Sequence, residues 1–389
     1  MKLHCIRFGD LGHLFDGPHA TPTRQSQGPY FLNIASLVDG RLDLTQSDHV
    51  SSVDFVRWTK RVTPAGGDLL FSYETRLGDA ALMPGGVEAC LGRRMALLRP
   101  NRQVVDPRFL LYYYLSPDFR TIIDRYTIHG ATVNRIGLST MGSWPISIPD
   151  LNEQRAIAEV LGALDDKIAV NANLLGAASG LAVALLSDHS PSVALADVVT
   201  HQKRSLAPTD FGDSWIAHFS LPAFDAGQRP QRTLPEEIKS SKFLIEQPCV
   251  LVSKLNPRFP RIWNVVELPN ALAVSSTEFL VLESTHCAPS VLWAILSQSS
   301  FSAELESKVA GTSGSHQRVR PADLLATDVI DPRSLNDGTK TQLDSLGRRI
   351  AVCLEESAAL ASMRDALLPQ LLSGKVRVND AEQKVGDVV

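Results

Sequence analysis

Two long stretches of this chain carry the heptad spacing of a coiled coil, and this feature constrains the fold more than any other. In residues 149–188, apolar or small residues recur at alternating steps of four and three, with one polar exception. The positions are Ile157, Leu161, Leu164, Ile168, Asn171, Leu175, Ala178, Ala182 and Leu185. A second stretch has the same spacing at Leu343, Leu346, Ile350, Cys353, Ser357, Leu360, Arg364, Leu367 and Leu371. We expect two long helices that bury these seams against each other as an antiparallel pair.

Capping signals predict where these helices begin and end. Asp150 with Glu153 forms a capping box at the first start, and Thr339 with Gln342 repeats it at the second. Gly374 is a C-terminal stop signal. The polar residues Asn171 and Arg364 weaken the seam but can fix its register.

Two glycines, Gly176 and Gly180, leave two alternatives open for the first helix. Either the helices approach each other closely at these positions, or the first helix breaks early, because glycine inside a helix costs about 1 kcal/mol. A further alternative for the first stretch alone is the long core helix of one large domain. The second occurrence of the seam favours a helical spacer instead.

Composition predicts an ordinary soluble globular protein. The chain has 389 residues, of which 44% are hydrophobic and 21% charged, and this length predicts two to three domains. Five cysteines occur without a CxxC pair, so we expect a reducing, cytoplasmic location. The first residues lack the apolar core of a signal peptide, and no run of 18 consecutive apolar residues occurs, so we expect no membrane span.

Net charge argues against a chain that binds nucleic acid through overall positive charge, because it is −4. Residues 1–150 hold 16 Lys and Arg against 14 Asp and Glu, and residues 191–333 hold 13 against 15. Any DNA contact must therefore use local clusters of cations or the charge of a partner.

The two halves of the chain repeat each other at a shift of 181 to 183 residues. The run 69–72 aligns with 250–253, and Leu111 aligns with Leu292. Each half has the order strand, helix, Gly-rich loop, strand, long helix. We predict globular domains at residues 1–149 and 189–336, long helices at 150–188 and 337–375, and a C-terminal tail at 376–389.

Several segments carry a family resemblance. ISIPDLNEQRAIAEVLGALDDKI (146–168) and MRDALLPQLLSG (363–374) look like the two linker helices of the specificity subunit of Type I restriction-modification systems. The runs GDLLFS (67–72), DPRFLLYYYLS (106–116) and HGATVNRIGLSTMGSWPISIP (129–149) resemble the target-recognition domain of that family. The second half departs from this pattern, with PCVLVS in place of GDLLFS and no Glu-Gln pair in its helix.

The resemblance implies an α+β fold with two α/β target-recognition domains separated by an antiparallel pair of long coiled-coil helices. It implies a subunit without catalysis or a cofactor of its own, in which each domain reads one half of a bipartite site in double-stranded DNA. Two methyltransferase subunits that use S-adenosylmethionine dock on such a subunit, and restriction subunits join them. The alternatives are a helical scaffold that assembles partners without touching DNA, and a stand-alone DNA-modifying enzyme.

Motifs for catalysis are weak. Two near-matches to the Asp/Asn-Pro-Pro-aromatic loop of amino-methylating enzymes, at residues 106–109 and 256–259, have arginine in place of the second proline. They do not occupy equivalent positions in the repeat. Glu237 and Lys239, with Asp225 upstream, are the sole candidates for a Mg²⁺ site, and a solvated turn is the commoner explanation.

DNA-contact candidates are loop residues whose side chains can position phosphates or read base edges. In the first domain they are Thr23, Arg24, Gln25, Tyr73, Arg76, Asn134 and Arg135. In the second domain they are Lys203, Arg204, Lys254, Arg258, Arg261, His316, Gln317 and Arg318. A surface or ion-pair role is more frequent for any single one of them. The cluster of Lys254, Arg258 and Arg261, in a loop stiffened by prolines, is the strongest candidate.

Overall fold

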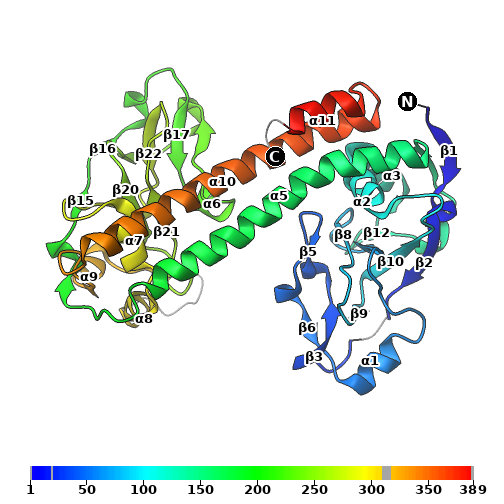
Figure 1. Ribbon diagram of the computed structural model, residues 1–389, viewed down its shortest axis with the longest axis horizontal. Coiled ribbons are helices and arrows are strands. Elements are labelled where there is room, and N and C mark those ends of the chain that lie inside the picture. The colour runs from blue at the N-terminus through cyan, green and yellow to red at the C-terminus, as the bar shows by residue number, and fades with distance from the viewer. Residues whose placement is uncertain (1, 19–20, 309–316, 387–389) are drawn as a thin grey trace. The chain divides into compact units, whose positions relative to one another are not determined.

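The computed structural model describes residues 2–18, 21–308 and 317–386 (Figure 1). The chain divides into two compact units. Unit 1 comprises residues 1–166 and 361–389, and unit 2 comprises residues 167–360. Each of the two long helices therefore contributes one part to each unit.

Unit 1 is built on an antiparallel four-stranded sheet whose order is β2-β10-β7-β8. These strands are β2 (Gly12–Asp16), β10 (Met95–Pro100), β7 (Leu69–Ser72) and β8 (Ala80–Leu82). Helix α2 (Pro107–Leu115) packs against β7 and β8, and α3 (Pro117–Tyr126) packs against α2. A second sheet joins β6 (Asp48–His49), β3 (Gln25–Leu32) and β9 (Ala89–Leu91). The smaller elements are β1 (His4–Arg7), η1 (Phe8–Leu11), η2 (Ile34–Ser36), β4 (Leu37–Val38), β5 (Arg41–Leu42), η3 (Leu44–Gln46), α1 (Ser52–Trp58), β11 (Thr127–Ile128), β12 (Arg135–Ile136), α4 (Leu138–Met141) and β13 (Pro145–Ile148).

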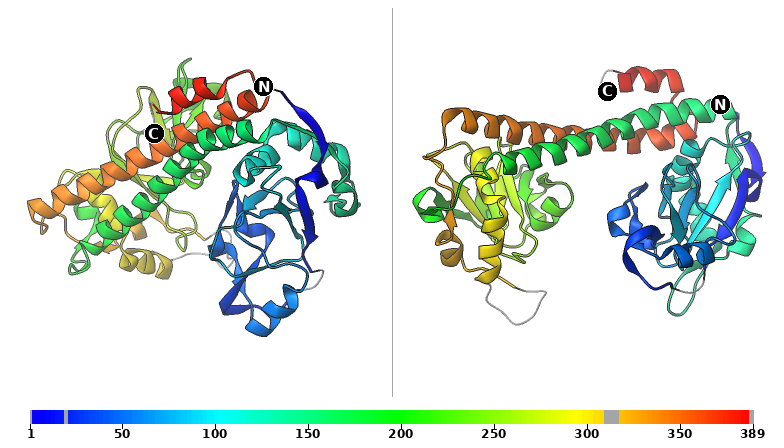
Figure 2. Two further views of the ribbon diagram at one scale, coloured as in Figure 1. Left: turned by 45° about the vertical axis from the view of Figure 1, so that its right-hand side comes forward. Right: turned by 60° about the horizontal axis from the view of Figure 1, so that its bottom comes forward.

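Unit 2 repeats the four-stranded sheet, in the order β15-β23-β20-β21. These strands are β15 (Thr200–Gln202), β23 (Phe279–Glu283), β20 (Cys249–Ser253) and β21 (Ile262–Val265). Helix α7 (Pro289–Leu296) packs on β20 and β21 (Figure 2). The second sheet has five strands, β16 (Ser205–Leu206), β19 (Lys242–Leu244), β22 (Leu272–Ser275), β17 (Ile216–Phe219) and β18 (Gln231–Thr233). The smaller elements are β14 (Val193–Ala194), η4 (Leu195–Asp197), η5 (Pro208–Asp210), α6 (Leu221–Asp225), η6 (Pro235–Glu237), α8 (Ser299–Ser307), α9 (Pro321–Leu325) and β24 (Asp328–Val329).

The repeat predicted from the sequence is confirmed in the four-stranded sheets of the two units. The aligned runs 69–72 and 250–253 lie in β7 and β20, which occupy the same inner position of their sheets. Both strands are buried along their whole length, which explains their continuous apolar sequence. The α+β fold with an internal repeat is therefore the fold of this chain.

The two long helices are α5 (Leu151–Ala184) and α10 (Asp337–Leu372). Their predicted seam positions are buried or half-buried, and Leu161, Leu164, Leu343 and Leu360 are fully buried. Asp165 of α5 contacts Arg364 of α10, and Asn171 of α5 contacts Glu356, so the residue numbers run in opposite directions and the pair is antiparallel.

In unit 1 the helix pair is held by Asp165. Its carboxylate accepts hydrogen bonds from Tyr112 at 2.6 Å and from Arg364 of α10 at 2.8 Å. Burial, together with this carboxylate, raises the pKa of Tyr112. The neighbouring Asp166 forms a two-pronged ion pair with Arg108 of α2, at 3.0 and 2.5 Å. The sequence Asp-Asp thus fixes both α10 and α2 to α5.

In unit 2 the helix pair is held by Glu356 of α10. Asn171, which is 2% exposed, donates to this carboxylate at 2.8 Å, and Lys167 lies 3.4 Å from it. The polar seam position is therefore satisfied by the opposite helix, which supports its predicted role in register.

The ends of the helices differ in part from the prediction. Asp150 caps α5 as expected, accepting from the N–H groups of Asn152 and Glu153. The cap of α10 is Asn336, which accepts from the N–H of Thr339 at 2.9 Å, so the capping box predicted to start at Thr339 is wrong. Gly374 ends the second helical region with φ of 70°.

The predicted C-terminal tail contains a helix, α11 (Val378–Gly386). Val378, Ala381 and Val385 are buried, at a spacing of three and four that matches one helix face. The limits predicted for the globular domains remain predictions, because the two units share both long helices.

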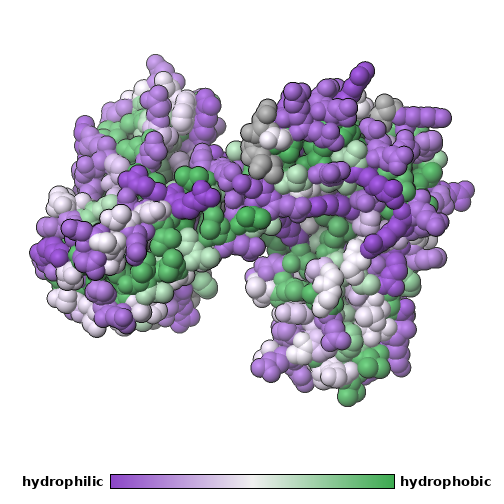
Figure 3. Space-filling view, in the orientation of Figure 1, coloured by the Kyte–Doolittle hydropathy of each residue, from purple (hydrophilic) through white to green (hydrophobic). Residues whose placement is uncertain are grey.

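One helix of the described residues, α5, is long and apolar enough to cross a membrane. Its seam is buried, Asp165 bonds to Arg364, and Asp166 bonds to Arg108. These contacts are typical of a helix that packs against other parts of a protein. In the view of Figure 3, hydrophilic residues cover much of each unit, and hydrophobic residues form smaller areas between them.

Candidate nucleic-acid interface

Three segments of unit 1 meet at one end of its four-stranded sheet: the loop 73–79 after β7, the turn 92–94 before β10, and residues 134–136. The N–H of Tyr73 donates to Arg94 at 3.2 Å, and its carbonyl accepts from Ile136 at 2.8 Å. The N–H of Thr75 donates to the carbonyl of Asn134 at 3.4 Å, and Glu74 forms a β-bridge with Arg135. The structure thus brings together DNA-contact candidates from the loop 73–79 and from residues 134–135, which are far apart in the sequence.

Unit 2 forms the same arrangement with the same backbone hydrogen bonds. The N–H of Lys254 donates to Glu278 at 2.9 Å, and its carbonyl accepts from Val319 at 3.0 Å. The N–H of Asn256 donates to Gln317 at 2.9 Å, and Leu255 forms a β-bridge with Arg318. The equivalence therefore extends from whole strands to single hydrogen bonds.

Both loops turn through a residue with positive φ, 69° at Thr75 and 52° at Asn256. Asparagine tolerates this conformation, whereas a β-branched threonine is strained in it. Strain of this kind costs on the order of 1–3 kcal/mol and persists where the surrounding structure fixes the backbone, as it often does at ligand-binding loops. The hydrogen bonds to residues 134 and 317 provide that constraint.

Several cations of the unit 1 loops are engaged within the protein. Arg76 lies 2.5 Å from Asp79 and also donates to the carbonyls of Ile34 and Leu37. Its guanidinium holds two loops together, so the structure gives it a structural role. Arg135 is exposed and makes no side-chain bond to any described residue, so it is free to meet a ligand.

Tyr73 must be corrected as a contact candidate. It is 6% exposed, and burial raises the pKa of its hydroxyl. Its aromatic ring belongs to the interior of unit 1, because it follows directly on the fully buried strand β7. Asn134 remains exposed, with its side-chain oxygen 3.3 Å from Nδ1 of His129.

The segment Thr23, Arg24 and Gln25 is exposed where the chain enters β3. Arg24 lies 2.9 Å from Asp48 and 6.0 Å from the centre of the Phe31 ring. No hydrogen bond or ion pair between described residues joins this segment to the loop 73–79.

Lys203 and Arg204 connect β15 to β16 in unit 2. Arg204 forms an ion pair with Glu246 at 2.6 Å. Burial, and then the charges of Lys203 and Lys254, lowers the pKa of His201.

The cluster of Lys254, Arg258 and Arg261 is only partly available. Arg261 forms a two-pronged ion pair with Asp225, at 2.7 and 2.9 Å. Arg258 is exposed and Lys254 is half-buried, and neither side chain has a partner among the described residues. The free positive charge of this loop therefore comes from residues 254 and 258.

The remaining candidates lie on the strand-like segment that pairs with this loop. Arg318 lies 2.9 Å from Glu278 and is 62% exposed. Gln317 is half-buried and accepts through its backbone carbonyl. His316 lies outside the described residues.

One exposed cation was missed by the sequence reasoning. Arg93 stands in the turn between β9 and β10, next to the backbone of Arg94 that bonds to Tyr73. The sequence pattern that could have identified Arg93 is Gly-Arg-Arg between two apolar runs, which is typical of a tight turn.

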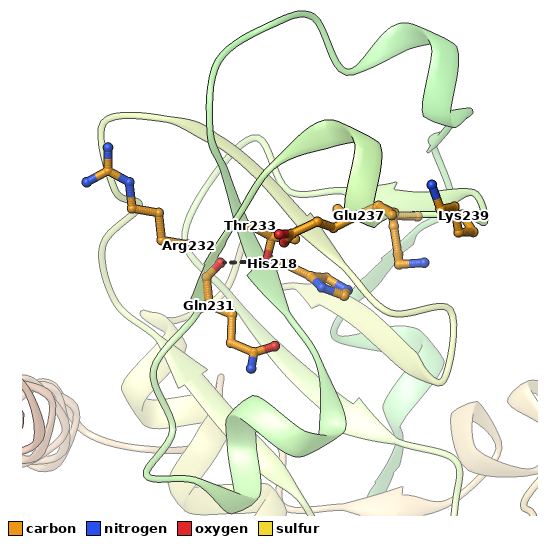
Figure 4. Close-up of a pocket in the computed structure, with 8 residues that line it drawn as sticks. His218, Gln231, Arg232, Thr233, Glu237 and Lys239 are labelled. Atoms are coloured by element: carbon orange, nitrogen blue, oxygen red, sulfur yellow. Dashed lines mark hydrogen bonds between the residues drawn. The ribbon is translucent and has the colours of Figure 1, made fainter.

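The metal site considered at Asp225, Glu237 and Lys239 is not assembled. Asp225 pairs with Arg261, whereas Glu237 and Lys239 line a cavity of about 450 Å³ together with His218, Gln231 and Thr233 (Figure 4). No group of three metal-ligating side chains occurs in the described part of the chain.

The two near-matches to a methyltransferase loop have structural explanations. Asp106 caps α2 by accepting from the N–H groups of Arg108 and Phe109, and Arg108 is held by Asp166. Asn256 forms the positive-φ turn described above. The two motifs therefore occupy different environments.

Comparison with known proteins agrees with the geometry. The family model described as the Type I restriction modification DNA specificity domain matches residues 31–177. A chain of Methanocaldococcus jannaschii, named as a type I restriction enzyme MjaX specificity subunit, is 26% identical over 163 residues, which are 39% of this chain and 37% of the relative. The match thus spans little more than a third of that relative.

The fold matches over nearly the whole length. The crystal structure of the Type I restriction-modification system S subunit from M. genitalium superposes with a TM-score of 0.59 and 14% identity, covering 95% of this chain and 96% of that one. The expected resemblance to the specificity subunits of Type I restriction-modification systems is therefore confirmed, by sequence over residues 31–177 and by fold over both units.

Proposed function

We propose that this chain is the non-catalytic DNA-recognition subunit of a Type I restriction-modification complex. In this proposal each unit reads one half of a bipartite site, and the α5–α10 pair sets the gap between the halves. Two methyltransferase subunits, carrying S-adenosylmethionine, dock on the chain, and restriction subunits complete the nuclease. The observation that supports it is the pair of loop arrangements built from equivalent hydrogen bonds, one in each unit.

The distribution of charge supports dependence on partner subunits. The chain has a net charge of −4, and many of its loop cations are neutralised by ion pairs, as Arg261 is by Asp225. The affinity of a protein for duplex DNA falls steeply with salt in proportion to the number of phosphates that it neutralises. A chain with few free cations therefore binds weakly alone and gains its grip from the assembled complex.

The decisive experiment is a selection from duplexes with long randomised blocks. The chain is co-purified with its methyltransferase subunits, bound duplexes are enriched, and the enriched pool is sequenced. We expect two short sequence blocks separated by a fixed gap. A pool that shows no enriched sequence, with a complex that binds all duplexes equally, would contradict the proposal.

Charge reversal tests which loop residues take part. Arg258→Glu is expected to weaken binding to the enriched duplex by about tenfold and to reduce the salt slope by about one unit, as the loss of one phosphate contact does. The matched control is Lys239→Glu, which makes the same change in net charge at another exposed position of unit 2. Equal binding by both variants and the unaltered complex would favour a protein scaffold without DNA contact.

The ion pair of Arg261 predicts a second pattern. Arg261→Asp alone places two carboxylates together, and the added exchange Asp225→Arg restores an opposite-charge pair. We expect the double variant to recover thermal stability lost by the single one. If DNA affinity stays low in the stable double variant, Arg261 also touches the duplex.

A further inference from the structure

Phe259 is the most exposed aromatic side chain among the described residues, at 72%. Phenylalanines elsewhere in unit 2 behave differently: Phe219 and Phe279 are 2% and 0% exposed. An aromatic ring gains nothing from folding when it remains in water, because the hydrophobic effect requires its burial. Exposure of this ring therefore points to a surface that is covered in another state.

The backbone presents this ring on a fixed turn. The N–H of Phe259 donates to the carbonyl of Asn256 at 2.9 Å, and prolines stand at 257 and 260. The base of the loop is closed by the N–H of Ser253, which donates to Arg261 at 3.0 Å. The loop has thus already lost most of its conformational freedom, so burial of the ring against a ligand requires little further ordering.

The charge around the ring indicates the chemistry of that ligand. Its neighbour Arg258 is exposed and unpaired among the described residues, and Lys254 at the start of the loop is unpaired as well. An apolar protein partner would leave two cations without counter-charge at the contact. A nucleic acid provides phosphates for the cations and flat apolar base faces for the ring.

Unit 1 lacks this feature at the equivalent place. Because Thr75 matches Asn256, the position that corresponds to Phe259 is Gly78, with φ of 91°. A side chain at residue 78 would collide with Arg120, whose guanidinium also donates to the carbonyl of Leu77. The two recognition loops share a backbone arrangement but present different side chains.

We infer that Phe259 stacks on or inserts between bases of the half-site read by unit 2, while Lys254 and Arg258 hold the flanking phosphates. This inference rests on the proposed function and adds an asymmetry to it. One half-site is distorted by an aromatic side chain, and the half-site of unit 1 is not contacted in this way by the equivalent loop.

The test uses the full chain in complex with its methyltransferase subunits and the duplex obtained by selection. 2-Aminopurine is placed in turn at each adenine of both half-sites, in duplexes without methyl donor. We expect one fluorescence change in one half-site that depends on Phe259, beside any change at the bases that the methyltransferase subunits take out of the stack. Phe259→Ala should abolish that change and weaken binding by about 5- to 150-fold, the range for loss of one base-aromatic stack.

Controls separate stacking from loss of fold. Phe259→Trp keeps a stacking surface and should retain both the affinity and the fluorescence change. Leu234→Ala removes an apolar side chain that is 48% exposed in the same unit and should leave both unchanged. The salt slope of Phe259→Ala should equal that of the unaltered chain, because no cation is lost.

The outcomes are distinct. If Phe259→Ala binds the selected duplex normally, with the same fluorescence change, the inference is wrong and the proposed function stands. If Phe259→Ala fails to assemble with the methyltransferase subunits, the ring is a protein contact and the inference is wrong. If the unaltered complex enriches no sequence, the proposed function fails and this inference fails with it.

Discussion

Two polar residues interrupt the apolar seam, and each is bonded to the opposite helix. Asn171 donates to Glu356 in unit 2, and Arg364 donates to Asp165 in unit 1. A polar group buried without a partner is costly, whereas a paired one excludes helix registers that would leave it unpaired. Slippage of the pair by one heptad would separate both partners, so these contacts specify one alignment.

Arg364→Met should destabilise unit 1, because it leaves the Asp165 carboxylate with less compensation. Both side chains are about one-fifth exposed, at 22% and 19%. Removal of one member of a largely buried ion pair costs on the order of 2–4 kcal/mol. Urea denaturation measures this loss, and Arg349→Met, at an exposed position of the same helix, serves as the control with a change below about 0.5 kcal/mol.

His218 predicts a pH dependence in the stability of unit 2. Burial, together with the charge of Lys242, lowers the pKa of His218 to about 4, from the ordinary value of about 6.5. Below pH 6.5 the unfolded chain therefore binds a proton that the folded unit excludes. Stability should fall as the pH is lowered from 6.5 to 4, by on the order of 1–2 kcal/mol after allowance for partial exposure.

The control for this effect is His218→Gln, which keeps a polar side chain of related size and cannot titrate. Denaturation midpoints at pH 7 and pH 5 are compared for the two proteins. A fall of the same size in both would show that other groups cause the pH dependence.

At the scale of the element, α5 runs unbroken through Gly176 and Gly180. The sequence left two alternatives for these glycines, a close approach of the two helices or an early break in the first helix. The structure shows neither at these positions. A Cβ atom at either position would meet no other atom within 4 Å. Close approach occurs instead at Gly347 of α10, where a Cβ atom would lie 2.4 Å from Ser290.

Gly176→Ala and Gly180→Ala should therefore stabilise the chain. Each replacement removes conformational freedom from the unfolded state and meets no obstacle in the helix, so we expect a gain of about 0.5–1 kcal/mol per site. Gly347→Ala is the opposing control, because its methyl group would collide with α7. Thermal unfolding that is unchanged by the first two substitutions would show that α5 frays there.

Helical periodicity made the long pair predictable, because a seam of several heptads is a strong signal. The true cap of α10 was harder to predict, since Asn336 and Thr339 both suit the role and only the backbone geometry selects between them. The helix α11 was missed although Val378, Ala381 and Val385 have helical spacing, because three apolar residues form a weak signal in a short polar segment.

At the scale of the whole molecule, the repeat could be predicted and the availability of individual side chains could not. Residue type suggested Arg76 and Arg261, yet Arg76 is bonded to the carbonyls of Ile34 and Leu37, and Arg261 is paired with Asp225. Such pairs depend on tertiary neighbours, which periodicity and composition do not encode. Conversely, the exposure of Phe259 is visible only in the folded unit 2, where the other phenylalanine and tryptophan residues are buried or half-buried.

Insertion of one heptad into both long helices should lengthen the gap of the selected DNA site. The insertion sites follow Asp166 in α5 and Leu360 in α10, at the boundaries between the two units. Seven residues add about 10 Å of helix, which corresponds to about 3 base pairs. Affinity should fall as well, because the half-sites rotate about the duplex axis when the gap grows.

The measurement is the same selection from randomised duplexes, applied to the lengthened chain. A heptad preserves the seam register, whereas insertion of two residues in both helices breaks it and provides a control that should not assemble. Recovery of the original gap by the lengthened chain would show that the helices do not determine the spacing.

The division of α10 between the units has a consequence for synthesis. Asp165 belongs to unit 1, but its partner Arg364 lies beyond residue 360, so residues 167–360 must be translated before this contact between α5 and α10 can form. At about 5–20 residues per second, the nascent N-terminal half waits on the order of 10–40 s for this part of the helix pair. Ribosome-associated chaperones, rather than early autonomous folding, are then expected to protect the first half of this polypeptide.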